Sequence, residues 1–205
     1  MSDPSTTFLI DEIAPHDAYK LCSGLIVPRP IGWIGSLSAD GIANLAPYSF
    51  FNLIGNDPMH VGFSPGSVGG SDKDSLANVR AVPEFTVNIV TDETVVAMND
   101  TAATLPPEED EFEHAGLTKL DSQLIRPPQV AEAIATMECR VTDIVHIGRE
   151  GGGNDLVVGE VIAIHVADRV LDGTRVDQHG LRAVGRHAGS WYSHATDLFD
   201  ITRPS

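Results

Sequence analysis

Lysine is scarce in this chain. Only Lys20, Lys73 and Lys119 are present, against 29 aspartates and glutamates, and the formal net charge at pH 7 is −16. No Lys or Arg occurs over residues 81–118. Because nucleic acid is bound mainly through cationic contacts to phosphate, this balance argues against a nucleic-acid partner. Excess surface carboxylate keeps a protein soluble, so we also hypothesise a saline cytoplasm.

Long apolar runs and closely spaced cysteines are also missing. No stretch approaches the roughly 18 apolar residues that span a membrane. The N-terminus MSDPSTTF lacks the basic and apolar parts of a secretory signal, so we expect a cytoplasmic protein with no membrane segment. Cys22 and Cys139 are far apart in the chain; we predict two buried free thiols, and a disulfide is the alternative.

Several common site motifs are absent. The eight histidines show no HxH, HExxH or Cys–His spacing, so no metal site is predicted. There is no GxGxxG after a strand and no GxxxxGKS/T, which removes support for a dinucleotide-binding helix or a P-loop. Ser190 and Ser193 lack the glycine frame of a hydrolase nucleophile. The segment 108–113, which is rich in acids, is predicted to be a solvated loop or a helix start, with an acidic docking surface as the alternative.

The remaining pattern predicts one mainly β domain over residues 1–205. Many strands with few helices favour a closed or nearly closed antiparallel barrel, although the pattern alone would also permit a sandwich. The predicted strands cover residues 25–37, 43–53, 59–64, 85–90, 138–147 and 156–170. The predicted helices cover residues 17–23, 74–81 and 93–103.

Residues 27–52, VPRPIGWIGSLSADGIANLAPYSFFN, carry the polar groups best suited to a ligand. Prolines on both sides place Arg29 on a stiff extended segment. A rough period of two over residues 31–37 predicts a half-buried strand, and Ala39-Asp40-Gly41 predicts a hairpin turn. The two strands would present a guanidinium, hydroxyls, an amide and an aromatic ring, which suit an anionic, planar ligand. Phe50 and Phe51 are predicted to pack in the core.

Lys73-Asp74-Ser75 is a second candidate anion site. A loop rich in glycine and serine leads there into a predicted helix, whose free N–H groups and positive dipole end favour an anion. The alternative is that Asp74 or Ser75 only caps the helix.

Together these segments resemble the flavin reductase-like domain family, whose members form an FMN-binding split barrel. The shared blocks run in the family's order over most of the chain. They are PRPI at 28–31, NLAPYSFFN at 44–52, DPMHVGFS at 57–64, KDSLANV at 73–79 and GRHAGSWY at 185–192. The family has paired hydroxyls where this chain has Gly35 and Ser36, so Gly35 is a departure that puts one side-chain hydrogen bond to the cofactor in doubt; a backbone amide could replace it.

The resemblance implies an antiparallel Greek-key split β-barrel, a homodimer with the flavin near the subunit boundary, and bound FMN. It implies a cofactor-binding set of Arg29, Ser36, Leu37, Asn44, Pro47, Tyr48, Ser49, Lys73, Asp74, Ser75, Asn78, Arg186 and His187. The phosphate and ribityl chain would meet Arg29, Ser36, Lys73, Ser75 and Asn78, and the ring would meet Asn44, Tyr48 and Ser49. No catalytic residue is identified. His187 is the one candidate, to position a nicotinamide or donate a proton, and a packed or solvated histidine is the alternative.

The implied activity is hydride transfer from NADH or NADPH to flavin, with electrons passing to free flavin, oxygen or a monooxygenase partner. One alternative is a flavin-binding electron carrier without NAD(P)H turnover, since fold and function separate easily. Another is a split barrel that holds a different ligand, such as heme.

Overall fold

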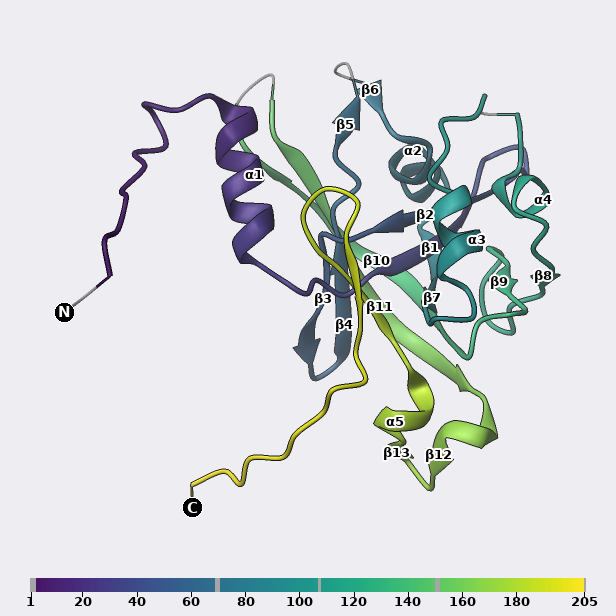
Figure 1. The fold of residues 1–205 in the computed structure, drawn as a ribbon. Coiled ribbons are helices and arrows are strands. Elements are labelled where there is room, and N and C mark those ends of the chain that lie inside the picture. Colours follow the sequence, from purple (N-terminus) through teal and green to yellow (C-terminus); the bar gives the residue numbers. More distant parts are fainter. Residues whose placement is uncertain (1–2, 69–70, 107, 150–151, 205) are drawn as a thin grey trace.

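The computed structural model describes residues 3–68, 71–106, 108–149 and 152–204. Its main feature is a seven-stranded sheet in the order β2-β1-β7-β10-β11-β4-β3 (Figure 1). All of its pairings are antiparallel, and neighbours far apart in the chain, such as β1 and β7, give the crossing connections of a Greek key. The mainly β prediction is confirmed. The strands are β1 (Gly32–Leu37), β2 (Ala43–Tyr48), β3 (Phe51–Asn56), β4 (Met59–Phe63), β7 (Glu84–Ile89), β10 (Ala135–Ile147) and β11 (Asn154–Val166).

The sheet curls until its two edges meet. β2 and β3 are at opposite ends of the strand order, yet only Ser49 and Phe50 separate them in the chain. So short a connection spans at most roughly 10 Å. No ladder joins β2 to β3 in the part of the chain that the structure describes. The sheet is therefore a barrel that stays open at this corner.

Two apolar clusters lie on the two faces of this sheet. The interior cluster includes Ile34, Phe63 and Phe85, and the outer one includes Trp33 and Phe112. Because consecutive residues of a strand point to opposite faces, β1 contributes to both clusters. The prediction of a half-buried strand was therefore wrong: β1 is buried on both sides over most of its length.

Short helices and strand pairs surround the sheet. The predicted helix at 74–81 is confirmed as α2 (Asp74–Ala81), while α1 (Pro15–Leu25) is longer than predicted and α3 (Val95–Asp100) is shorter. The predicted strand 25–37 begins too early, because α1 extends to Leu25 and β1 begins only at Gly32. The predicted strand 43–53 is two strands, because the barrel corner at Ser49 and Phe50 separates β2 from β3. The predicted strand 156–170 ends earlier, and η1 (Asp168–Val170) follows β11.

The remaining helices and strands are short. They are β5 (Ser67–Val68), β6 (Ser71–Asp72), α4 (Glu111–His114), β8 (Lys119–Leu120), β9 (Gln129–Val130), β12 (Leu171–Asp172), β13 (Arg175–Val176), α5 (Gln178–Leu181), β14 (Val184–Arg186) and β15 (Tyr192–His194). Among the described residues, no helix is long and apolar enough to cross a bilayer.

Three predictions of burial need correction, those for Cys22, Phe50 and the acidic segment 108–113. Both cysteines are free, but Cys22 is exposed and only Cys139 is buried. Phe51 packs against the interior cluster, whereas Phe50 is partly exposed at the barrel corner. Glu111 and Phe112 are buried, because α4 packs against β2. The acidic segment does start a helix, as predicted, but it is not wholly solvated.

Candidate functional site

A basic cavity of about 390 Å³ lies between α1, the β1–β2 side of the sheet and the β14–β15 pair. It is lined by Tyr19, Ser23, Arg29, Ile31, Pro47, Ser49, Lys73, Met98, Asn99, Ala102, Arg186, His187, Ala188, Gly189 and Tyr192. Three of these side chains are permanent cations and none is a carboxylate. In a chain with a net charge of −16, such a cavity is a local exception that suits an anionic ligand.

Arg29 is buried at the wall of this basic cavity, and most of its guanidinium is already engaged. Nη1 donates to the carbonyl oxygens of Ser23 (2.5 Å) and Ile26 (2.9 Å), and Nη2 donates to that of His187 (3.0 Å). Nε donates to Ser49 Oγ at 3.3 Å. A guanidinium has five N–H donors, so one remains for a ligand. Arg29 therefore mainly ties α1 and the C-terminal segment to the sheet.

Arg186, whose backbone pairs with that of Arg29, also lines this cavity together with Tyr192. Its guanidinium lies 4.5 Å from the centroid of the Tyr192 ring and donates to the Tyr192 hydroxyl and to the carbonyl of Gly189. His187 Nε2 lies 2.9 Å from Ser193 Oγ. These contacts hold Arg186 and His187 in place through the β14–β15 pair, and both still line the basic cavity.

A second cavity, of about 340 Å³, shares Pro47, Lys73 and Ala102 with the first. Its other lining residues are Asn44, Ala46, Tyr48, Asp72, Asp74, Ser75, Thr101, Ala103, Thr104, Leu105 and Glu111. Within the described residues, Lys73 makes no ion pair, and its Nζ lies 5.6 Å from the centroid of the Tyr48 ring. Lys73 is itself the N-cap of α2, with no side-chain capping hydrogen bond. The alternative that Asp74 or Ser75 only caps the helix is therefore not supported.

The floor of the second cavity is a buried hydrogen-bond network. Asn44 Oδ1 is 2.7 Å from Ser75 Oγ and 3.2 Å from Ser36 Oγ. Tyr48 donates its hydroxyl to Ser75 Oγ (2.9 Å), and Asn78 Nδ2 donates to Ser36 Oγ (3.1 Å). The fold thus brings five predicted site residues into direct contact. Ser36 and Asn78 line neither of the two cavities, and Ser36 connects Asn78 to Asn44.

Burial raises the pKa of Tyr48 to about 12, against the opposing effect of its hydrogen bond to Ser75. Tyr48 therefore stays a neutral hydroxyl donor at physiological pH.

Glu111 is the member of this network that sequence reasoning missed. Its Oε1 accepts from Asn44 Nδ2 at 2.7 Å, and its Oε2 accepts from the backbone N–H of Leu45 at 3.0 Å. Burial raises the pKa of the Glu111 carboxyl, and the hydrogen bonds from Leu45 and Asn44 oppose that rise only in part. The one signal in the sequence was the apolar Phe112 beside it, which is fully buried.

The structure explains the departure at Gly35 and corrects the prediction for Leu37. A Cβ at Gly35 would lie 2.3 Å from Thr86 Oγ1 and 2.8 Å from the carbonyl oxygen of Pro128, so no side chain fits. A side chain at position 35 would lie on the face of β1 opposite to that of Ser36. The absence of a hydroxyl side chain here therefore follows from the close packing of Thr86 and Pro128 against Gly35. Leu37 is not brought to either of these cavities; it packs against the outer apolar cluster.

Comparison with known proteins agrees with this architecture. Residues 24–183 match the sequence family described as the flavin reductase like domain. An uncharacterized protein from Halalkalibacterium halodurans is 35% identical over 198 residues, which are 95% of each chain. A second, from Aquifex aeolicus, is 37% identical over 190 residues, which are 92% of this chain and 95% of that one.

Solved structures show the same fold. Nitrilotriacetate monooxygenase component B from Bacillus cereus superimposes with a TM-score of 0.95 at 35% identity, covering 98% of this chain and 100% of that one. The 2-nitrobenzoate 2-nitroreductase of Pseudomonas fluorescens gives 0.89 at 27% identity, covering 98% and 97%. A split-barrel chain from Shewanella frigidimarina gives 0.82 at 20% identity, covering 95% and 96%, and confirms the predicted split barrel. The chain belongs to the flavin reductase-like domain family.

Proposed function

We propose that this chain is an oxidoreductase that binds FMN in the two adjoining cavities and reduces it with NADH or NADPH. The observation that carries the proposal is the basic cavity without a carboxylate, which opens beside a floor of hydroxyl and amide groups. A phosphate needs cations and N–H donors, and a flavin ring needs fixed polar groups around its nitrogen and oxygen atoms. The combined cavities have the size of a typical cofactor site.

Lys73 and the first turn of α2 would hold the phosphate, with the remaining N–H of Arg29 as a further donor. Asn44, Tyr48 and Ser75 would address the ribityl chain and the ring from the floor of the second cavity. Arg186 and His187 would close the site from the β14–β15 pair. This assignment keeps the predicted residues except Leu37, and it moves Ser36 and Asn78 to a supporting role.

Bound flavin would supply the hydride chemistry, and the protein would supply binding, orientation and exclusion of water. His187 would position the nicotinamide of the electron donor. For the electron acceptor, the likeness to a monooxygenase component B supports a monooxygenase that uses reduced flavin. The likeness to a nitroreductase supports a nitroaromatic compound as the second candidate.

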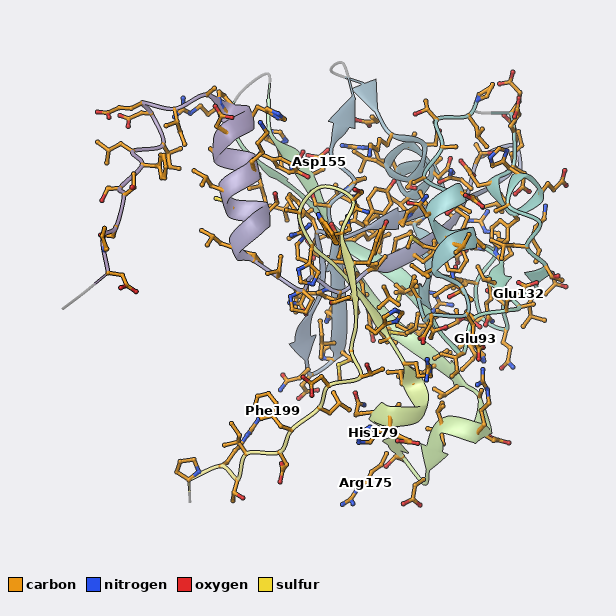
Figure 2. All side chains as sticks on the ribbon, in the orientation of Figure 1. Glu93, Glu132, Asp155, Arg175, His179 and Phe199 are labelled. Carbon is orange, nitrogen blue, oxygen red and sulfur yellow. The ribbon has the colours of Figure 1, made fainter. Side chains whose placement is uncertain are left out.

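A homodimer is part of the proposal. Exposed apolar side chains gather where α1 ends, at Leu25 and Ile26, and on the β3–β4 side of the sheet, at Leu53 and Ile54. The rings of Tyr19 and Phe50 lie 6.4 Å apart and link the two groups. Both terminal segments extend from this same side of the molecule (Figure 1), and Phe199 lies on the extended C-terminal segment (Figure 2). A second copy of the chain would cover this surface.

The deciding experiment is a titration of the purified protein with FMN, followed by anaerobic addition of NADH and of NADPH. We expect saturable binding, a higher melting temperature with FMN and bleaching of the flavin absorbance by one of the two donors. Flavin that binds but stays oxidised with both donors would identify an electron carrier instead. A protein that neither binds FMN nor melts later in its presence would overturn the proposal.

A further inference from the structure

We propose that Glu111 is a positioning residue of this site. Its carboxylate fixes the side-chain amide of Asn44, and through Asn44 it sets which way the hydroxyl hydrogens point at the floor of the second cavity. The effect on Asn44 follows from contacts within the chain, whereas the effect on a ligand rests on the proposed flavin function.

The first step is the contact between Glu111 and Asn44. An ionised carboxylate only accepts hydrogen bonds. Both oxygens of Glu111 are engaged by donors, Oε1 by Asn44 Nδ2 at 2.7 Å and Oε2 by the Leu45 N–H at 3.0 Å. The N–H side of the Asn44 amide must therefore face Glu111. Its oxygen must then face the opposite way, toward Ser36 and Ser75.

The second step follows the hydrogens outward from Asn44. Since Oδ1 is an acceptor, the hydroxyls of Ser75 (2.7 Å) and Ser36 (3.2 Å) both donate to it. Each serine has one hydroxyl hydrogen, so its oxygen must accept from the next group. The Tyr48 hydroxyl donates to Ser75 and Asn78 Nδ2 donates to Ser36, as the geometry requires. One ionised carboxylate thus determines the direction of the whole network.

Protonation of Glu111 would reverse this order. A protonated carboxyl group donates its O–H. The nearest acceptor would be Asn44 Oδ1, after the side-chain amide of Asn44 has flipped by half a turn and exchanged the places of its oxygen and nitrogen. Nδ2 would then donate to Ser36 and Ser75, whose hydroxyl hydrogens must leave Asn44. Because burial raises the pKa of Glu111, the change should occur at milder acidity than for an exposed glutamate.

Several other charged or titratable groups are near enough to influence this equilibrium. Those sharing the second cavity with Glu111 are Tyr48 of β2 and Asp72, Lys73 and Asp74 at the start of α2. Those on or capping its own helix are Asp110, Glu113 and His114. The negative charge of Asp74 favours the protonated form of Glu111.

The first test follows the Asn44 side-chain amide by NMR in the protein without ligand. Lowering the pH from 8 to 4 should shift its two N–H signals in the wild type, because the raised pKa of Glu111 is crossed within this range. In Glu111→Gln the Gln oxygen would accept from Leu45 and its NH₂ would face Asn44, so the signals should stay at one position throughout. Glu113→Gln is the matched control, because it removes the same charge from an exposed position of the same helix. Wild-type signals that do not move, or that move equally in Glu111→Gln, would overturn the proposal.

The second test measures the dissociation constant of FMN in the same three proteins. At pH 8 the wild type should bind about fivefold more tightly than Glu111→Gln, the equivalent of one hydrogen bond. At pH 4 this difference should shrink, because the raised pKa of Glu111 favours its protonated form there, while Glu113→Gln follows the wild type. Protonation of the FMN phosphate changes the dissociation constants of all three proteins by the same factor, so it cancels in the ratio of the dissociation constants of any two.

The two tests separate the two proposals. If no protein binds FMN, the proposed function fails and the amide signals still decide the role of Glu111. If the wild type binds FMN but keeps the same affinity ratio to Glu111→Gln at both pH values, the positioning role fails and the proposed function stands.

Discussion

At the scale of single residues, Lys73 has the most direct predicted effect on ligand affinity. It lines both cavities and makes no ion pair within the described part of the chain. Its charge is therefore available to a ligand, unlike that of Arg29, whose donors are mostly used within the protein.

Lys73→Met should weaken FMN binding roughly 10- to 100-fold, the loss expected for one hydrogen bond to a charged group. Methionine keeps much of the side-chain length, so the second cavity should keep its shape. Fluorescence titration of FMN measures the effect. Lys20→Met is the control, because Lys20 lies on exposed α1 and pairs only with Asp17 among the described residues. Equal affinity in all three proteins would place the phosphate elsewhere, with Arg186 as the next candidate.

At the scale of elements, one buried glutamate attaches a long loop to the sheet. Glu138 of β10 is fully buried and accepts from the backbone N–H groups of Gln123 (2.8 Å) and Leu124 (2.7 Å). His165 Nε2 of β11 lies 2.7 Å from the same carboxylate. Burial alone would raise the pKa of Glu138, but these hydrogen bonds and His165 outweigh it and lower the pKa below its usual range.

Glu138→Gln should reduce the free energy of unfolding at pH 7 by about 2–4 kcal/mol, because its NH₂ group would meet one of these donors. Since the folded-state pKa is lowered, the stabilisation is present above the ordinary carboxyl pKa and is lost as the pH falls through the folded-state value. Urea unfolding from pH 7 down to pH 3 should show the difference from the wild type shrinking in acid. Glu132→Gln is the control. The carboxylate of Glu132, which is labelled in Figure 2, accepts from the backbone N–H of Thr118 at the surface, so this change should lower the free energy of unfolding much less. A difference that stays constant with pH would mean that the charge of Glu138 is not the cause.

Local chemistry explains which elements the sequence predicted well. The helix at 74–81 has polar residues at its start and Pro83 just beyond its end. After Pro83, β7 alternates polar and apolar residues, the period of two that is typical of a strand. The break at Ser49 and Phe50 has no comparable local signal, because it depends on where the two sheet edges meet. Glu111 shows the same limit within the site: its partners are 66 and 67 residues away, while its neighbours in the chain are mostly acids.

At the scale of the whole molecule, the apolar surface between α1 and β3 should make the protein a dimer. We expect light scattering after gel filtration to give twice the chain mass of 21.9 kDa. Leu25→Glu should shift the protein toward the monomer, because it places a charge within that surface. Val96→Glu is the matched control, since Val96 is 72% exposed against 79% for Leu25 and lies on α3, away from that surface (Figure 1). A wild type that elutes at the mass of one chain would contradict the proposed homodimer.

The contrast between a basic cavity and an acidic chain also has a kinetic consequence. A doubly charged phosphate ligand approaching from solution is first repelled by the net charge of −16 and is attracted only near the cavity. Salt screens the long-range repulsion, since the Debye length falls from about 30 Å at 0.01 M to about 8 Å at 0.15 M. We expect the association rate of FMN, measured by stopped flow, to rise with added salt, and an association rate that falls would contradict this. Lys73→Met should keep that rise and mainly speed dissociation. Moderate salinity would then be the condition in which the site fills fastest.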